Sequence, residues 1–259
     1  MQIDLRKNMA LKYSKIIVGG CSVTDKNYPK TARPNSLDFK MWPEIIGDKL
    51  NCKVINTAKC GYGNQAIFHE TLTAIMNNNN IDHVIVMWSD WTRQDFLIST
   101  ELNLKDDYRY KTFNPNVEYD DAGLHGDADH GASKTWYEKT FKQKYPNTKQ
   151  LIDTNINYIY SLQTICEKLN IKYTALSSIS TIMGPGFYFM DKQLLDHPFL
   201  EKIENFMGWP LFESIGGYSM KDLCKSKFGK AYRVSSIDAH PNEESHKFIA
   251  DKIMEYINE

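Results

Sequence analysis

Short apolar runs recur along the chain, and the stretches between them carry apolar residues at every third or fourth position. The runs are Lys15–Gly19, Lys53–Asn56, His83–Trp88 and Ile171–Leu176. None of them alternates cleanly between apolar and polar residues, which is typical of parallel strands covered on both faces. We therefore predict that these runs form buried strands of a mainly parallel sheet.

Helical periodicity fills the stretches between the runs. The predicted helices are Phe39–Leu50, Asn64–Met76, Lys149–Leu169 and Asn242–Ile257. Ser36 and Asp38 are candidate N-caps for the first of them. Strands that alternate with helices predict an α/β fold, a doubly wound sheet with helices on both faces.

Two long segments interrupt this alternation. Residues 94–145 are polar and aromatic, and residues 177–234 contain Gly and Pro punctuation with room for short helices. Both are longer than ordinary connections, so we interpret them as insertions that wall or cover a site within one domain spanning residues 1–259. The stretch DDAGLHGDADHG at 120–131 holds groups suited to a metal ion. It lacks the spacing and terminal Glu of an EF-hand, so we favour a polar loop there.

Composition narrows the range of partners and compartments. The formal net charge is −1, with acids and bases mixed along 259 residues, so we do not expect nucleic acid as a partner. The five cysteines form no CxxC pair, which argues against a zinc site and favours a reducing compartment. No signal peptide is evident, and no apolar stretch approaches the roughly 20 residues of a spanning helix. We expect a cytoplasmic protein without a membrane span, and we leave open its oligomeric state and a place in a larger assembly.

Chemistry-bearing residues cluster at the predicted strand ends. They are Ser22 after the first strand, Gly61, Gly63 and Asn64 after the second, Ser89, Asp90 and Arg93 after the third, and Asp238 and His240 before the last helix. Ligands in open α/β sheets bind outside the carboxyl ends of the strands. We therefore expect these four loops to meet at one edge of the sheet.

The residue types at that edge suit nucleophilic catalysis. A serine hydroxyl needs a base to take its proton, and His240 is the candidate base for Ser22. Asp238 is the candidate carboxylate that orients the imidazole. Backbone N–H groups near Ser22 and at Gly61 are candidates to bind an oxyanion, with Asn64 or Ser89 as a side-chain donor. This chemistry needs no metal or organic cofactor.

Four short motifs resemble the conserved blocks of the SGNH (GDSL-like) hydrolase superfamily. They are GCSVT around Ser22, NTAKCG ending at Gly61, MWSD containing Ser89, and DAHP containing His240. The resemblance implies a three-layer α/β/α sandwich with a mainly parallel, five-stranded, flavodoxin-like sheet. It also implies a serine esterase that works through an acyl-serine intermediate, with a small-molecule or glycan ester as its partner. Because the insertions carry many Tyr and Trp residues, we favour carbohydrate O-acetyl groups as the substrate.

The sequence departs from the family pattern at three positions. Cys21 stands where the family has Asp, Ser89 stands where it has Asn, and Ile237 occupies the usual acid position. Asn64 or a shifted loop is then the substitute for the missing Asn. Asp238 lies two residues before His240, so either a different turn lets it reach the imidazole or a backbone carbonyl orients the ring instead.

Simpler structural roles stand beside each functional one. Taken singly, Ser22 could be a turn residue and His240 a structural residue. Gly61 could be a glycine that only forms a turn. Arg93 either clamps a substrate anion or pairs with Asp90 or Asp95.

Two aromatic residues and one thiol have similar alternatives. Trp88 and Trp91 either stack on a sugar or pack in the core. Cys21 is a second possible nucleophile, ranked below Ser22 because the two side chains should point in opposite directions.

Three functions fit these residues. The first is a serine esterase. The others are a catalytically impaired SGNH-like module with a glycan-binding, protein-binding or structural role, and an O-acyltransferase.

Overall fold

A five-stranded parallel sheet forms the centre of the computed structural model, which describes residues 13–28, 38–99, 108–113, 147–180, 190–236 and 238–259. The strands are ordered β2 (Lys53–Asn56), β1 (Lys15–Gly19), β3 (His83–Trp88), β6 (Lys172–Ser177) and β7 (Phe206–Met207). This order is the flavodoxin-like one, and it reverses between β1 and β3. The flavodoxin-like sheet predicted from the SGNH resemblance is confirmed.

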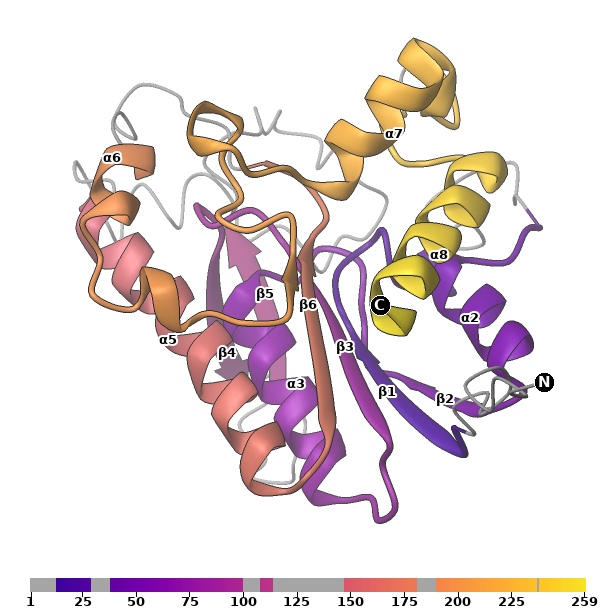
Figure 1. The fold of residues 1–259 in the computed structure, drawn as a ribbon, viewed down its shortest axis with the longest axis horizontal. Coiled ribbons are helices and arrows are strands. Elements are labelled where there is room, and N and C mark those ends of the chain that lie inside the picture. Colours follow the sequence, from indigo (N-terminus) through magenta and orange to yellow (C-terminus); the bar gives the residue numbers. More distant parts are fainter. Residues whose placement is uncertain (1–12, 29–37, 100–107, 114–146, 181–189, 237) are drawn as a thin grey trace, which may run out of the picture.

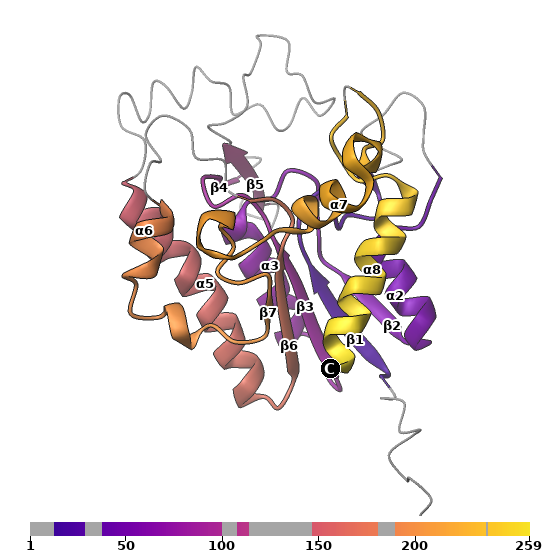
Figure 2. The same ribbon diagram turned by 45° about the horizontal axis from the view of Figure 1, so that its top comes forward.

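Helices cover both faces of the sheet (Figures 1 and 2). Helices α3 (Asn64–Met76) and α5 (Thr148–Lys168) lie on one face, and α2 (Trp42–Leu50) and α8 (Glu243–Asn258) lie on the other. Two hydrophobic cores result, one on each face. The first contains Ile17, Ile67, Val84, Val86, Ile152 and Ile156, and the second contains Ile16, Val18, Trp42, Ile46, Ile249 and Ile253. Successive residues of β1 thus enter opposite cores, which explains why its sequence shows no polar alternation.

Helix boundaries follow local capping chemistry. Helix α2 begins at Trp42, later than predicted, because the Glu44 carboxylate accepts a hydrogen bond from the Met41 N–H at 3.0 Å. Asp38 therefore lies outside the helix, and Ser36 lies outside the described residues. Helix α8 is capped by the Asn242 side chain, which accepts from the Ser245 N–H at 3.0 Å.

The first insertion starts with an antiparallel hairpin that the sequence pattern did not predict. It consists of β4 (Gln94–Ser99) and β5 (Tyr108–Phe113). The Asp95 carboxylate fixes this hairpin to the start of α3, because it accepts the N–H groups of Gly63 and Ala66 at 2.9 Å and the hydroxyl of Thr112. The stretch 120–131, weighed above as a metal loop, lies outside the described residues.

The second insertion contributes to the sheet itself. It contains α6 (Met190–Leu195), η1 (Leu200–Lys202), β7, η2 (Glu213–Ile215), α7 (Met220–Phe228) and η3 (Gly229–Tyr232). Strand β7 pairs in parallel with β6 and supplies the fifth strand. Across the described residues, no helix has both the length and the hydropathy required to cross a membrane.

Candidate active site

Ser22 lies in a tight turn directly after β1, at the point where the strand order reverses. The carbonyl of Cys21 accepts the N–H groups of Thr24 and Asp25 at 2.9 and 3.0 Å and closes this turn. A Cβ atom on Gly20 would lie 2.3 Å from the Thr24 hydroxyl, so only glycine fits there. The strand and its turn therefore deliver the Ser22 side chain to the edge where ligands bind in doubly wound sheets.

Cys21, the second possible nucleophile, points away from this edge. Its thiol is buried in the core of the α3/α5 face, where its sulfur lies 3.8 Å from the Ser178 hydroxyl. A buried structural thiol is a poor nucleophile.

His240 reaches Ser22 from the loop before α8. The Ser22 Oγ lies 2.8 Å from His240 Nε2, although the two residues are 218 positions apart in the chain. The loop is held in place because the Val234 N–H donates to the His240 carbonyl at 2.9 Å and Arg233 forms a bridge with Pro241. The His240 side chain is 32% exposed, so this imidazole remains open to an incoming substrate.

Asp238 contacts the other nitrogen of the same ring. Its Oδ1 lies 2.7 Å from His240 Nδ1 and also accepts the backbone N–H of His240 at 3.1 Å. Its own N–H donates to the Ser235 hydroxyl at 3.1 Å. This turn lets a carboxylate two residues before the histidine reach the imidazole. The Asp238 side chain is only 1% exposed, so the carboxylate faces the ring in a poorly hydrated position.

The same geometry assigns the tautomer of His240. A carboxylate oxygen at 2.7 Å from Nδ1 requires a hydrogen on that nitrogen, because two lone pairs at this distance would repel. Nε2 is then unprotonated in the neutral ring and accepts from Ser22. This is the arrangement in which an imidazole removes a proton from a serine hydroxyl.

Tyr28 is a site residue that the sequence reasoning missed. Its hydroxyl lies 2.7 Å from His240 Nδ1 and 3.4 Å from Asp238 Oδ1, and the rings of Tyr28 and His240 are 4.2 Å apart between centroids. It lies outside all four motifs, and no local pattern distinguishes it from other tyrosines.

The last residue of β2 and the loop that follows it are each bonded to the Ser22 turn. Asn56 Nδ2 donates to the Thr24 carbonyl at 2.8 Å, and the Cys60 N–H donates to Asp25 Oδ2 at 2.9 Å. Gly61 follows with φ +87°, a conformation that favours glycine. Within the described part of the chain, the backbone N–H groups of Ser22 and Gly61 donate to no protein acceptor. Both therefore retain a hydrogen for an anion.

The two side-chain candidates for the oxyanion hole are placed differently. Asn64 donates from Nδ2 to the Ser89 carbonyl at 3.2 Å and to Asn155 Oδ1 at 2.6 Å, and its Oδ1 accepts the Ser89 N–H at 2.7 Å. Both amide hydrogens of Asn64 are thus used inside the protein. The Ser89 hydroxyl is buried and has no hydrogen-bond partner among the described residues, so its hydrogen is uncommitted.

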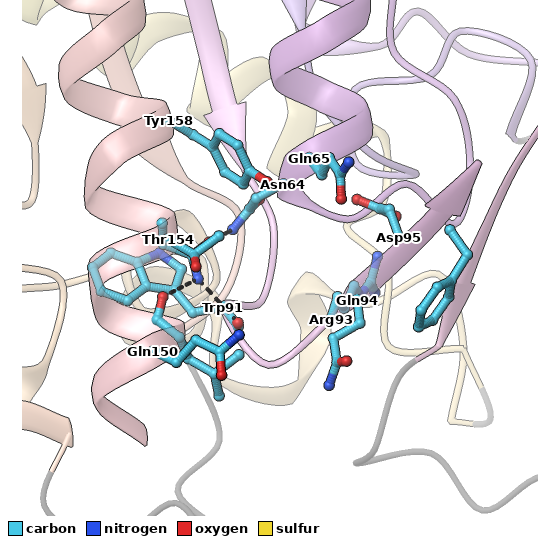
Figure 3. A pocket seen from close by; sticks show the side chains of 12 residues that line it. Asn64, Gln65, Trp91, Arg93, Gln94, Asp95, Gln150, Thr154 and Tyr158 are labelled. Atoms are coloured by element: carbon cyan, nitrogen blue, oxygen red, sulfur yellow. Dashed lines mark hydrogen bonds between the residues drawn. The ribbon is translucent and has the colours of Figure 1, made fainter. Parts of the chain in front are cut away.

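Arg93 borders a cavity of about 150 Å³ between α3, α5 and the start of β4 (Figure 3). Polar residues dominate its lining, among them Gln65, Gln94, Gln150 and Tyr158. Arg93 donates to the Tyr62 carbonyl at 3.0 Å and makes no ion pair within the described residues. Neither Ser22 nor His240 lines this cavity.

The two tryptophans occupy the core. Trp88 and Trp91 are completely buried on the α3/α5 face. A ligand has no access to the ring of Trp88, so the structure supports its core-packing role and not the predicted contact with substrate. Trp91 forms part of the wall of the cavity beside Arg93.

Burial changes the titration of two groups near these residues. Burial, and next the electrostatic interaction with His240, lower the pKa of His246 to about 3, so this histidine is neutral. Burial also raises the pKa of Asp95, although its hydrogen bonds and the Arg93 guanidinium oppose the rise. Among the described residues, no group of three or more His, Cys, Asp or Glu side chains is arranged to hold a metal ion.

This chain is similar to several solved structures of esterases and lipolytic proteins. The psychrotrophic esterase EstA from Pseudoalteromonas sp. has 12% identity and a TM-score of 0.48, with 95% of this chain and 97% of that chain covered. A member of the lipolytic protein G-D-S-L family from Veillonella parvula has 13% identity and a TM-score of 0.45, with 93% and 97% covered. An acetyl xylan esterase from Butyrivibrio proteoclasticus has 11% identity and a TM-score of 0.41, with 97% and 65% covered.

No protein-family model matches the sequence, and no curated protein does. The likeness to the solved structures concerns the fold. We therefore base the proposed function on the geometry of the site.

Proposed function

We propose that this protein is a serine hydrolase of the SGNH type that cleaves small carboxylic esters. One observation carries the proposal: Ser22, His240 and Asp238 form a continuous series of contacts, 2.8 Å from Oγ to Nε2 and 2.7 Å from Nδ1 to Oδ1. The hydroxyl can therefore lose its proton to a base whose resulting positive charge is stabilised by a buried carboxylate.

The reaction proceeds in two halves that both use His240. Ser22 Oγ attacks the ester carbonyl carbon while its proton passes to His240 Nε2. The tetrahedral intermediate collapses, the imidazolium protonates the departing alkoxide, and an alcohol leaves the acyl-serine. Water then attacks the acyl carbon, His240 takes its proton and returns it to Ser22 Oγ, and a carboxylic acid is released.

The negative charge of each tetrahedral intermediate needs hydrogen-bond donors. The backbone N–H groups of Ser22 and Gly61 supply them. Neither side-chain candidate does so, because the amide hydrogens of Asn64 are already donated to Ser89 and Asn155 and the Ser89 hydroxyl is completely buried. One such donor typically contributes about a hundred- to a thousandfold in turnover.

The cavity beside Arg93 supports a polar substrate. Carboxamides both donate and accept hydrogen bonds, as sugar hydroxyls require, and Gln65, Gln94 and Gln150 line the cavity together with the Arg93 guanidinium. We place O-acetylated carbohydrate first among the ester classes, with Arg93 contacting a part of the substrate away from the reacting ester, since neither Ser22 nor His240 lines this cavity.

A panel of substrates tests the proposal. Purified protein should release p-nitrophenol from p-nitrophenyl acetate faster than from longer-chain esters, and should release acetate from acetylated sugars. Ser22→Ala should abolish both activities. If the hydroxyl of an added sugar takes the acyl group in place of water, the protein is an acyltransferase. A well-folded protein inactive on the whole panel would instead favour the binding module.

A further inference from the structure

Two hydroxyl groups from one short segment contact the imidazole of His240 at its two nitrogens. Ser22 Oγ lies 2.8 Å from Nε2, and the Tyr28 hydroxyl lies 2.7 Å from Nδ1. The tyrosine ring also packs against the imidazole, with 4.2 Å between centroids and 36° between planes. The ring of His240 is therefore held at both ends and on one face by residues 22–28.

The segment that carries Tyr28 is itself fixed to the site. Tyr28 is buried, and its N–H donates to the Asp25 carbonyl at 3.0 Å. The Asp25 carboxylate accepts the N–H of Asn27 at 2.9 Å and that of Cys60 at 2.9 Å. The tyrosine thus belongs to the same bonded unit as the nucleophile turn and the loop that carries the Gly61 N–H.

Proton positions determine what the hydroxyl does. His240 Nδ1 bears one hydrogen, which points toward Asp238 Oδ1 at 2.7 Å. The Tyr28 oxygen, also at 2.7 Å from Nδ1, offers lone pairs to that same hydrogen, and its own hydrogen is directed to Asp238 Oδ1 at 3.4 Å. Both interactions favour the tautomer that leaves Nε2 able to accept the Ser22 proton.

Asp238 contacts both His240 and Tyr28 through the same carboxylate oxygen. Its Oδ1 accepts three donors: the Nδ1–H of His240, the backbone N–H of His240 and the Tyr28 hydroxyl. The tyrosine oxygen supplies a second acceptor beside Nδ1, and its ring face stabilises the imidazolium.

We propose that Tyr28 is a positioning residue, whose hydroxyl holds His240 in the Nδ1–H tautomer and orientation needed for deprotonation of Ser22. This inference rests on the proposed function. Tyr28 does not touch the reacting atoms and acts through His240.

Tyr28→Phe tests this role, because it removes the hydroxyl and keeps the packed ring. We expect kcat on p-nitrophenyl acetate to fall about three- to tenfold, the effect of one lost hydrogen bond, with KM unchanged. ¹⁵N NMR of the imidazole should show a larger fraction of the Nε2–H tautomer. Tyr13→Phe is the matched control, since Tyr13 is buried just before β1, at the opposite end of that strand from Ser22, and its hydroxyl has no partner among the described residues.

Each outcome separates the two proposals. An unchanged or higher kcat, or a lower kcat with an unchanged tautomer, would overturn the positioning role. A fall that Tyr13→Phe reproduces would do the same. If the wild-type protein has no turnover, the proposed function fails, and NMR still decides whether Tyr28 controls the tautomer: a shift supports that control and an unchanged spectrum excludes it.

Discussion

Two polar clusters lie at the same edge of the sheet and are built from similar residues. The reactive cluster consists of Ser22, Tyr28, Asp238 and His240, and the buried amide network consists of Asn64, Ser89 and Asn155 with the Trp91 carbonyl. In the amide network, both asparagines donate all their amide hydrogens to protein acceptors. In the reactive cluster, contacts run from a buried carboxylate to a hydroxyl beside a partly exposed imidazole.

The difference shows how one fold divides its polar residues between stability and chemistry. The amide network joins the start of α3, the end of β3 and α5, and its two asparagines have no amide hydrogen left for a substrate. The reactive cluster contains a hydroxyl beside a base, and that base, the His240 imidazole, is partly exposed. Substitutions in the amide network should therefore change stability, and substitutions in the reactive cluster should change turnover.

Two histidines six positions apart should respond in opposite ways. His240→Gln should reduce ester turnover by about a thousandfold to a millionfold, because the base is lost, with little change in stability. His246→Gln changes a buried ring that contacts neither Ser22 nor Asp238, so it should lower stability and keep activity in the folded fraction. Kinetics and urea unfolding measure the two effects. Equal loss of turnover in both variants would contradict the assignment of His240.

Asp238→Asn should produce the next largest effect. The amide can donate to Nδ1 and so favours the tautomer in which Nε2 carries the hydrogen, which lowers kcat by about a hundred- to ten-thousandfold. The size of the side chain is unchanged, so circular dichroism should match the wild type. Wild-type kcat in a folded Asp238→Asn protein would mean that another group orients His240.

Asn155→Leu should break the amide network without touching the reactive cluster. It removes the acceptor for Asn64 Nδ2 and the donor for the Trp91 carbonyl, both buried. We expect the free energy of unfolding to fall by about 1–3 kcal/mol, as measured in urea. A variant as stable as the wild type would show that the network is dispensable.

The pH dependence of stability should come partly from two buried histidines. Burial lowers the pKa of His83 to about 4 and that of His246 to about 3, from the ordinary 6.5. Between those values and pH 6.5 the unfolded chain binds more protons than the folded protein, so stability is present above pH 6.5 and is lost as the pH falls. The slope should approach about 1.4 kcal/mol per pH unit for each histidine. His246→Phe should flatten it; an unchanged slope would contradict the shift at His246.

The sequence predicted those features that depend on local pattern and topology. The runs at β1, β2 and β3 and the helix at α3 have the predicted bounds, because each is an apolar run or stripe ended by its own polar or glycine residues. The position of Ser22 was predictable because ligands bind at the carboxyl ends of parallel strands, and its contact with His240 was expected from the motifs GCSVT and DAHP.

Other features depend on partners distant in sequence. Strand β7 has two residues, too few for a pattern, and the β4–β5 hairpin is polar and fixed through Asp95. Asn64 donates an amide hydrogen to Asn155, which comes from α5. The role proposed for Tyr28 depends on its contact with His240, which lies in the loop before α8. Such pairs leave no signal in a single sequence.

The central claim is that Ser22 is a nucleophile activated by His240. Treatment with a fluorophosphonate, followed by peptide mass mapping, tests it most directly. We predict one adduct, on Ser22, that is absent from His240→Gln and from protein unfolded in urea. An adduct on another residue, or none on folded wild-type protein, would contradict the claim.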